Sequence, residues 1–499
     1  MPSTIHSAVA VAAAALIGLT GCMGAPMAEQ GGAGPAMAKA SRPNVIVIMA
    51  DDLGYADIGA YGIKRIPTPN IDSIGKEGVI FTDGYASAPV CSPSRAATQT
   101  GRYQQRFGFE FNNGPPSRDA EQGLGIDVGE ITLAKQLKTS GYHTGLIGKW
   151  HLGSQDQFYP TNRGYDEFVG LLTGATSYID LKAPNVIHYK GDAGGGADGG
   201  GGGGGRTQYT QIVEGPQRKV VDNYQEYLTE YFARRGVEYV NRNAASSDPY
   251  FLYMGFTAPH RPLTVTKKYY DRFPHIKTEH HRIYAAMVSS LDDAVGELLA
   301  AVDRSGERDN TIIYFIADNG CAAYYEGMCA CEPLRGGKLT HYEGGVRIPY
   351  LMRWPAKIKT PQIYRQVVST MDIFPTVTAA AGGTLATDRA YDGVDLAPYL
   401  TGAKSGMPHE ALMWRRSPLV SIRQGDWKMW KELNGKYTLL FNLKDDLNET
   451  KNLAAANPAK VRELEDALTK WGKDMQDPRW PSRPETTYNV CGTPFTVPI

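Results

Sequence analysis

The chain has 499 residues, of which 42% are hydrophobic and 21% are charged, a composition typical of a globular protein with one or two domains. Its 52 basic and 52 acidic residues cancel to a net charge of zero, which disfavours a nucleic-acid-binding protein because phosphate binding needs a surplus of positive charge. We therefore expect no nucleic-acid partner, and we expect any bound anion to be held by a local cluster of positive charge.

The N-terminus is typical of an exported protein. Residues 8–19 form an apolar run of 12 residues, which suits a signal peptide and is too short to span a bilayer. The run ends in Leu19-Thr20-Gly21-Cys22, which resembles a bacterial lipobox. We therefore expect residues 1–21 to be a lipoprotein signal peptide and Cys22 to anchor the protein to a bacterial membrane, in the periplasm or at the cell surface. A plain secretory signal with a chance cysteine is the alternative. We expect no other membrane contact, since no later run reaches 18 apolar residues.

Residues 22–42 are rich in Gly, Ala, Pro and Met and predict a flexible tether. The following part, residues 43–400, alternates apolar runs with helical patterns. The predicted strands are Asn44–Ala50, Thr144–Ile147, Tyr250–Phe256 and Thr311–Ala317, and the predicted helices are Thr132–Ser140, Leu228–Asn241 and Tyr284–Asp303. This alternation predicts an α/β fold with a doubly wound sheet. In such sheets, ligands bind beyond the carboxyl ends of the strands.

Two further segments depart from this pattern. Residues 191–205 contain 11 glycines, which predict a mobile loop insertion and not a phosphate-binding loop. Residues 401–499 predict a smaller α+β subdomain with an antiparallel sheet. Its predicted strands are Ala411–Arg416, Leu419–Arg423, Trp427–Lys431 and Tyr437–Phe441, followed by a helix over Pro458–Met475.

The sharpest motif is Cys91-Ser92-Pro93-Ser94-Arg95, followed by Thr100-Gly101-Arg102. A cysteine beside an arginine is a candidate reactive thiol, because a cation favours the thiolate; an inert cysteine at the start of a helix is the alternative. The segment resembles the C-x-P-x-R and T-G-R pattern of type I sulfatases, which belong to the alkaline phosphatase superfamily. In that family the cysteine becomes formylglycine. The resemblance therefore implies this modification at Cys91, made by a formylglycine-generating or an anaerobic maturation enzyme. Thr98 stands where the family more often has Leu.

Polar residues follow two of the predicted strands. Asp51-Asp52 and Asp318-Asn319 supply three carboxylates and one amide at strand ends, and such oxygen ligands suit a hard cation. Taken alone, each Asp could instead cap a helix or a turn. Together they resemble the sulfatase calcium site. The resemblance implies one Ca²⁺ ion, held by Asp51, Asp52, Cys91, Asp318 and Asn319.

Four other segments are similar to sulfatase motifs. Gly148-Lys149-Trp150-His151-Leu152-Gly153 places Lys149 and His151 two residues apart, so on extended backbone both would point to one face. His260 lies in a proline-rich turn, Lys338 lies in a glycine-rich loop, and residues 440–453 match a C-terminal signature. Alone, each Lys or His would more often be an ordinary core or surface residue. The resemblance covers residues 43–455 and implies a large mixed, mostly parallel sheet sandwiched by helices, as in alkaline phosphatase.

The resemblance also implies hydrolysis of sulfate monoesters with release of inorganic sulfate. One hydroxyl of the hydrated aldehyde at position 91, activated by Asp318, would attack sulfur. His260, with Lys338, would protonate the departing alcohol oxygen, and His151 would deprotonate the second hydroxyl so that the aldehyde returns. Positive charge would come from the calcium ion and from Arg95, Lys149 and Lys338.

An exported sulfatase is expected to act on a sulfated polysaccharide or oligosaccharide. Four residues in loops or at strand edges are candidates for contacting the sugar or a neighbouring sulfate: Tyr178, His341, Arg415 and Arg416. Two alternatives remain open. One is a phosphonate or phosphate diester hydrolase of the same superfamily, and the other is a non-catalytic glycan-binding lipoprotein in which Cys91 stays unmodified.

Four cysteines remain after Cys22 and Cys91: Cys321, Cys329, Cys331 and Cys491. An even number in an exported protein favours disulfides, and three connectivities are possible. A metal site at Cys329-x-Cys331 is disfavoured, because the spacing is short and no second cysteine pair exists.

Overall fold

The computed structural model describes residues 42–114, 116–193, 210–221, 225–323, 328–330, 332–482, 485–490 and 493–497. The expected signal peptide, Cys22, nearly all of the expected tether and most of the glycine-rich loop lie outside these residues, as do Cys331 and Cys491. Within the described part of the chain, no helix is both long and apolar enough to cross a membrane.

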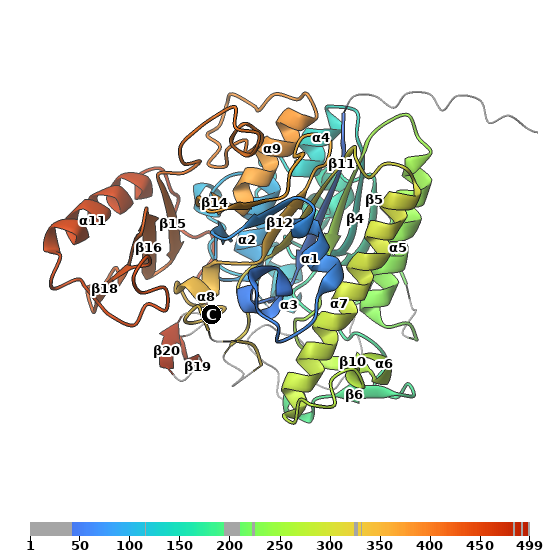
Figure 1. Ribbon diagram of the computed structural model, residues 1–499, viewed down its shortest axis with the longest axis horizontal. Helices are drawn as coiled ribbons and strands as arrows, with labels where there is room; N and C mark the ends of the chain where they lie inside the picture. Colours follow the sequence, from blue (N-terminus) through green and yellow to red (C-terminus); the bar gives the residue numbers. More distant parts are fainter. Residues whose placement is uncertain are drawn as a thin grey trace, which may run out of the picture. The chain divides into compact units, whose positions relative to one another are not determined.

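A ten-stranded sheet forms the centre of the fold (Figure 1). Its five middle strands are parallel and run in the order β11 (Thr311–Ala317), β1 (Asn44–Ala50), β9 (Tyr250–Gly255), β4 (His143–Lys149) and β5 (Glu167–Leu171). The strands β1 and β11 have the predicted bounds. Every residue of both is buried, because their continuous apolar runs are covered on both faces of the sheet.

The outer strands make the sheet mixed. One edge carries β12 (Tyr350–Arg353), β2 (Val79–Phe81) and β13 (Gln362–Tyr364), and the other carries β7 (Val213–Glu214) and β8 (Lys219–Val220). Four of the nine strand pairings in this sheet are antiparallel. A mixed, mostly parallel sheet is therefore confirmed, although none of these outer strands was predicted from the sequence.

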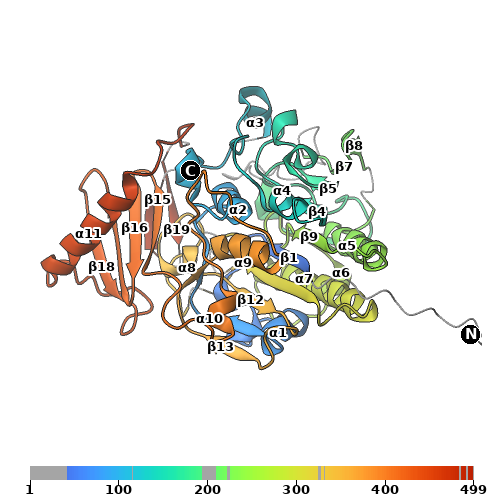
Figure 2. The same ribbon diagram turned by 90° about the horizontal axis from the view of Figure 1, so that it is seen from above.

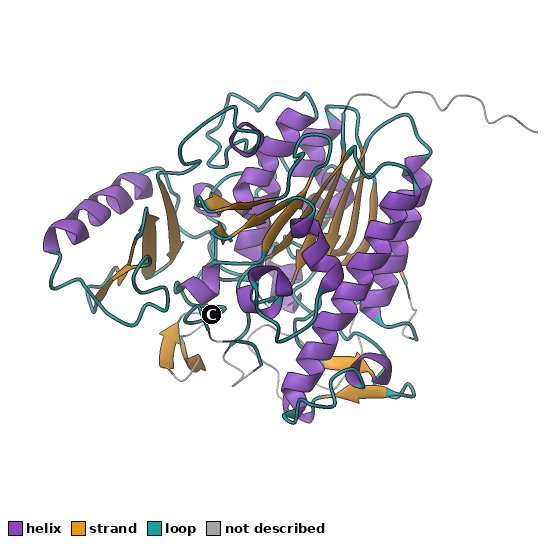
Figure 3. Cartoon of the chain, viewed as in Figure 1, coloured by secondary structure: helices purple, strands orange, loops and turns teal. Residues whose placement is uncertain are grey.

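Helices cover both faces of the sheet. One layer consists of α1 (Pro69–Lys76), α5 (Leu228–Ala244) and α7 (Glu279–Arg304), and the other of α2 (Cys91–Thr100), α4 (Leu133–Lys138) and α9 (Ile373–Ala380). Figure 2 shows the two layers on opposite sides of the sheet, and Figure 3 shows the sheet between them. The predicted helices over residues 132–140, 228–241 and 284–303 correspond to α4, α5 and α7. Thr132 precedes α4, and its side chain accepts a hydrogen bond from the Lys135 backbone N–H, as a helix cap should.

Short elements complete the main body. The two-stranded ladders pair β6 (Val186–His188) with β10 (Thr264–Thr266), β3 (Gly84–Tyr85) with β14 (Val368–Ser369), and β19 (Thr486–Val490) with β20 (Thr493–Val497). The short α-helices are α3 (Pro116–Gln122), α6 (Lys267–Tyr270), α8 (Glu343–Val346) and α10 (Ala397–Leu400). Seven 3-10 turns are present in the described residues: η1 (Tyr55–Asp57), η2 (Gly59–Tyr61), η3 (Gln104–Phe107), η4 (Asp156–Phe158), η5 (Pro160–Arg163), η6 (Lys190–Ala193) and η7 (Thr370–Asp372).

The C-terminal sheet is a separate antiparallel meander. Its strands are β15 (Ala411–Arg416), β16 (Leu419–Gln424), β17 (Trp427–Glu432) and β18 (Thr438–Asn442), and they pair in chain order. Val420 and Ile422 pack in one apolar cluster with Leu464 of the helix α11 (Pro458–Gly472). Leu419 packs in a second cluster, which includes Val90 and Leu339. The period-2 alternation therefore directs one face of the sheet to α11 and the other to segments beside Cys91 and Lys338.

Cys321 and Cys329 form a disulfide. This bond settles one of the pairings that the sequence left open. Among the described cysteines, Cys91 is free.

Candidate active site

The carboxyl ends of β1 and β11 bring the two predicted polar pairs together. Ala50 lies opposite Ala317 in the parallel register, so Asp51-Asp52 and Asp318-Asn319 leave the sheet side by side. The Asp52 backbone N–H donates to Asp318 Oδ1 at 3.2 Å, and Asn319 Nδ2 donates to Asp52 Oδ1 at 2.8 Å. All four residues are buried. They form a buried cluster of oxygen ligands at one edge of the sheet.

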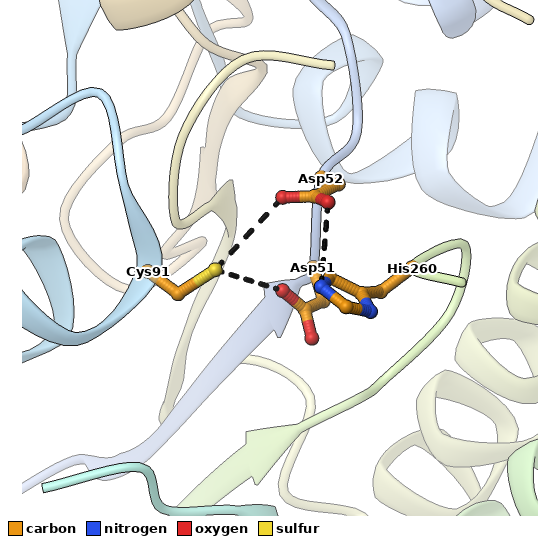
Figure 4. A group of neighbouring side chains, drawn as sticks. All are labelled: Asp51, Asp52, Cys91 and His260. Carbon is orange, nitrogen blue, oxygen red and sulfur yellow. Dashed lines mark hydrogen bonds and ion pairs between the residues drawn. The ribbon is translucent and has the colours of Figure 1, made fainter. Parts of the chain in front are cut away.

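Cys91 is the first residue of α2 and points at this cluster. Its Sγ lies 3.6 Å from Asp51 Oδ1 and 3.9 Å from Asp52 Oδ1 (Figure 4). The side chain is 1% exposed. Burial raises the pKa of the Cys91 thiol well above its usual value, although the charges of Lys149 and Lys338 oppose this effect. This shift favours the neutral thiol in the unmodified cysteine.

Arg95 forms an ion pair with Asp318 and does not contact the thiol of Cys91 in the contacts observed. Its Nε and Nη2 lie 3.0 and 2.8 Å from Asp318 Oδ2, and its Nη1 donates to the Lys149 carbonyl at 3.2 Å. Burial by itself would raise the pKa of Asp318, but the charges of Arg95 and Lys149 hold it well below the usual range. Arg95 therefore keeps Asp318 ionised and ties α2 to the end of β4.

Lys149 and His151 reach the site from the end of β4. Lys149 is the last residue of the strand, and its Nζ lies 2.7 Å from Asp51 Oδ2. His151 has φ = 58°, so the expectation of one extended segment is wrong: a left-handed residue, and not alternation along a strand, sets the direction of this side chain. Burial and the charges of Lys149 and Arg95 lower the pKa of His151 well below its usual value. The ring is therefore neutral, and its Nδ1 is buried without a hydrogen-bond partner.

His260 and Lys338 face each other over Asp52. The distance from His260 Nε2 to Asp52 Oδ2 is 3.6 Å, and Lys338 Nζ lies 2.9 Å from the same oxygen and 3.3 Å from His260 Nε2. His260 Nδ1 lies 2.6 Å from the Arg261 carbonyl oxygen. Figure 4 shows the ring entering from the turn that follows β9. The Tyr178 hydroxyl donates to the carbonyls of Thr257 and His260, so Tyr178 supports the turn that carries His260.

The charges of this site balance before any ion is added. Three carboxylates, from Asp51, Asp52 and Asp318, face the three cations of Arg95, Lys149 and Lys338. A divalent cation would leave the site positive, which suits an anionic substrate.

The ligand atoms also fit a hard cation. Asp51, Asp52, Cys91 and His260 each offer a ligand atom within 4.8 Å of the others. Asn319 Oδ1 is buried without a hydrogen-bond partner, which leaves it available as a ligand. Carboxylate and amide oxygens are ligands that a hard cation such as Ca²⁺ prefers. A second group, Asp57 with Cys321 and Cys329, is no metal site because its two cysteines form the disulfide.

The remaining candidates lie beside the C-terminal sheet. Arg415 Nε lies 2.7 Å from Glu110 Oε2, and its Nη2 donates to the Gln476 carbonyl, so Arg415 is bound within the protein. Arg416 and His341 are 2% and 0% exposed. Neither ring nitrogen of His341 has a hydrogen-bond partner.

Sequence reasoning missed a hydrogen-bonded relay behind Cys91. Ser92 Oγ donates to Asn113 Oδ1, Asn113 Nδ2 donates to Asp119 Oδ2, and Asp119 Oδ1 accepts from the Ser154 backbone N–H. The relay joins the start of α2 to the loop after His151. No local pattern signals it, because its members come from three separate segments.

Comparison with known proteins identifies the family. A sequence model of the sulfatase family matches residues 43–383. The chain belongs to the sulfatase family. It is 32% identical to arylsulfatase G of Rattus norvegicus over 84% of each chain, and 32% identical to N-acetylgalactosamine-6-sulfatase of Homo sapiens over 90% of this chain and 88% of that one.

A crystal structure of Ps i-CgsB in complex with k-i-k-neocarrahexaose superposes on this sulfatase with a TM-score of 0.77, at 34% identity over 88% of this chain and 94% of that one. The sulfatase is therefore a sulfuric ester hydrolase. These relatives do not favour the alternative of a phosphonate or phosphate diester hydrolase.

Proposed function

We propose that this sulfatase removes sulfate from a sulfated polysaccharide or oligosaccharide, with a formylglycine made from Cys91 and one bound calcium ion. The observation that carries the proposal is the position of Cys91 Sγ, 3.6 and 3.9 Å from two buried carboxylates that are themselves paired with cations. The names of the relatives support a sugar sulfate as the substrate, because one is an N-acetylgalactosamine-6-sulfatase and another was solved with a neocarrahexaose.

Asp51, Asp52, Asp318, Asn319 and position 91 would hold the calcium ion, which would polarise the sulfate group when bound, and a formylglycine hydrate at position 91 would supply a hydroxyl nucleophile. The cationic side chains of the protein also stabilise the negative charge of the sulfate group. Lys149 and Lys338, which pair with Asp51 and Asp52 respectively, bring positive charge to the sulfate oxygens. Arg95 holds Asp318 in its ionised form, in which the carboxylate can accept a hydrogen bond from the hydroxyl of the nucleophile.

His260 and Lys338 form the acid of the site. In the neutral ring, the Nδ1–H donates to the Arg261 carbonyl, which leaves Nε2 to receive a proton on the side of Lys338. Protonated Nε2 then donates to the departing alcohol oxygen. His151, neutral because of its lowered pKa, is able to accept a proton from the second hydroxyl at position 91.

The proposal also includes export, lipid anchoring and maturation of the protein. The apolar run over residues 8–19 and Cys22 support export and a lipid anchor, and Cys91 requires a formylglycine-generating or anaerobic maturation enzyme. Mass spectrometry of the mature N-terminus and of the Cys91 peptide tests both points. We expect an acylated Cys22 and an aldehyde at position 91 that is lighter than the thiol.

The decisive experiment replaces the nucleophile. The variant Cys91→Ala should keep its fold and its calcium content, measured by circular dichroism and metal analysis, but should not turn over 4-nitrophenyl sulfate. Full activity of the variant would contradict the proposal. Parallel assays with an aryl phosphonate ester should give the wild type a lower kcat/KM than the sulfate does, and the reverse order would favour the phosphonate hydrolase.

A further inference from the structure

We propose that a cavity beside the C-terminal sheet binds an uncharged sugar residue of the glycan substrate. The cavity has a volume of about 460 Å³, which lies in the range of small-molecule binding sites. Because four aromatic side chains line it, we call it the aromatic cavity; they are Tyr342, Trp430, Tyr437 and Phe495. The inference deepens the proposed function and rests on it, since the sugar is part of the same glycan.

Three separate parts of the chain meet at the aromatic cavity. Trp430 lies in β17 and Tyr437 directly precedes β18. Tyr342 belongs to the segment that follows Lys338, and Phe495 lies in β20. Figures 1 and 2 show the hairpin of β19 and β20 next to α8 and the C-terminal sheet. The cavity is therefore formed by tertiary packing, and no single sequence motif signals it.

The aromatic rings contact one another around Trp430. The centre of the Trp430 ring lies 4.5 Å from that of Tyr342, 6.1 Å from that of Phe495 and 5.8 Å from that of Tyr437. Trp430 and Tyr342 are 1% and 4% exposed, whereas Tyr437 is 37% exposed. The buried rings thus hold the exposed Tyr437 ring in place, where it can pack against the C–H face of a sugar ring.

Trp430 also brings an unused hydrogen-bond donor to the cavity. Its indole Nε1–H is buried and has no hydrogen-bond partner in the described part of the chain. An indole N–H only donates, so the missing partner is an acceptor, and a buried donor without one destabilises the protein. Because Trp430 lines the cavity, a sugar hydroxyl bound there can supply that acceptor.

The charged residues of the lining favour an uncharged sugar. They are Glu432, Lys436 and Glu485, and Lys436 Nζ lies 3.0 Å from Glu432 Oε1. Burial and the charges of Glu432 and Glu485 raise the pKa of Tyr437 to about 12. A further cation, Arg335, lies over the Tyr342 ring at 4.6 Å but is not part of the lining.

The lining therefore has no surplus of positive charge with which to hold a sulfate or a carboxylate. Its carboxylates can instead accept hydrogen bonds from sugar hydroxyls. Aromatic rings with a small number of polar groups are typical of a ligand site that fixes the orientation of a largely apolar surface.

The aromatic cavity is tied to the segments that carry Cys91 and Lys338. Tyr342 follows Lys338 by four residues, so their Cα atoms are at most about 14 Å apart. Trp430 and Tyr342 also share an apolar cluster with Val90 and Leu339, the sequence neighbours of Cys91 and Lys338. A short oligosaccharide spans such a distance, and one relative was solved with a neocarrahexaose. A glycan with its sulfate ester at Lys338 can therefore place another of its sugars in the cavity.

The first experiment measures binding of neutral sugars to the full-chain protein by calorimetry. The probes are four unsulfated hexasaccharides, with galactan, glucan, mannan and chitin backbones. We expect at least one to bind, and Tyr437→Ala to weaken its binding by about three- to tenfold. The control Tyr399→Ala removes a half-buried tyrosine of α10 that does not line the cavity, and it should change the affinity less than about twofold.

Trp430→Phe keeps an aromatic ring but removes the indole N–H, so it should weaken binding by about threefold. If this variant has a lowered unfolding temperature, Tyr437→Ala decides the question. The tightest-binding hexasaccharide, once sulfated on every residue, should bind with an affinity that Tyr437→Ala leaves unchanged. Absence of binding by all four neutral sugars at millimolar concentrations, or equal affinities for wild type and Tyr437→Ala, overturns the sugar site.

Kinetics separate this inference from the proposed function. With the same hexasaccharide carrying a single sulfate, Tyr437→Ala should raise KM about three- to tenfold and leave kcat unchanged, while 4-nitrophenyl sulfate turnover stays within about twofold. A protein that binds the neutral sugar through Tyr437 but cleaves no sulfate ester would contradict the proposed function and support the sugar site. An active enzyme whose KM for the hexasaccharide is insensitive to Tyr437→Ala would overturn the inference alone.

Discussion

Replacement of Asp119 by Asn tests the relay behind Cys91. Asp119 is 1% exposed, and burial raises the pKa of its carboxyl from 3.8 to about 7, with hydrogen bonds from Ser154 offsetting only part of this effect. Asparagine keeps the size of the side chain and can still accept from the Ser154 backbone N–H. Its amide can be accommodated by a flip of the Asn113 amide, because the Ser92 hydroxyl can accept as well as donate. The variant therefore removes the titration of this site and retains its packing.

The magnitude follows from the two pKa values. A carboxyl with a raised pKa in the folded state stabilises the protein fully below its unfolded pKa, near 3.8, and this contribution is lost as the pH rises through about 7. At about 1.4 kcal/mol per pKa unit, integration between pH 5 and pH 8.5 gives a loss of about 3 kcal/mol for the wild type. Asp119→Asn has no such loss at this position, so its stability relative to the wild type should rise by about 3 kcal/mol over the same interval.

The assay is urea unfolding followed by tryptophan fluorescence at pH 5 and pH 8.5. The quantity compared is the difference in the free energy of unfolding between the variant and the wild type at each pH, because the contributions of all other titrating groups cancel in this difference. Glu121→Gln, on the exposed side of the same helix α3, is the matched control and should show a difference below about 0.5 kcal/mol at both values. A difference for Asp119→Asn that is the same at pH 5 and pH 8.5 would refute the buried, perturbed carboxyl.

Three further predictions concern other parts of the molecule. Lys428→Met should lower the free energy of unfolding by about 3 kcal/mol, because it removes the buried cation that lies 2.8 Å from Glu343 and 3.3 Å from Glu449, whereas the exposed Lys436→Met should change it little; equal effects in urea unfolding would contradict the buried network. Gly148→Ala should yield little folded protein on gel filtration, because Gly148 has φ = 114° and a Cβ there would overlap the Gly255 carbonyl, whereas Gly472→Ala, with open space around it, should be produced normally. Chelation with EGTA should abolish turnover and lower the unfolding temperature, with both restored by added calcium; an unchanged unfolding temperature would argue against a bound ion.

The central strands could be predicted because their signal is local. Asn44–Ala50 and Thr311–Ala317 are seven-residue, largely apolar runs, and an aspartate follows each of them. Such a run is enough to predict a strand that is buried on both faces of a sheet. The edge strands carry no such signal. β7 has two residues and β2 has three, so their conformation depends on the partner strand that they meet and not on their own sequence.

The residues of the site could be predicted from the sequence where they lie in recognisable motifs. The parallel register explains why Asp51 and Asp318, distant in the chain, meet at one edge. The direction of His151 was not predictable, because a positive φ in a residue other than glycine has no sequence signature here. The pairing of Arg95 with Asp318 was not predictable for a similar reason, since the sequence shows the distance of Arg95 from Cys91 along a helix but not that the guanidinium contacts Asp318.

The segment from Lys338 to Glu343 connects two buried charge networks, and this connection ties the C-terminal sheet to the candidate active site. Lys338 belongs to the carboxylate cluster through Asp52. Glu343 accepts from Lys428 of β17, and its backbone N–H donates to Glu449 after β18. Because breaking a buried pair leaves an uncompensated charge, the sheet cannot separate from the core without displacing this segment. The zero net charge of the chain therefore conceals two buried charge clusters, and the segment that begins at Lys338 is tied to the second of them through Glu343.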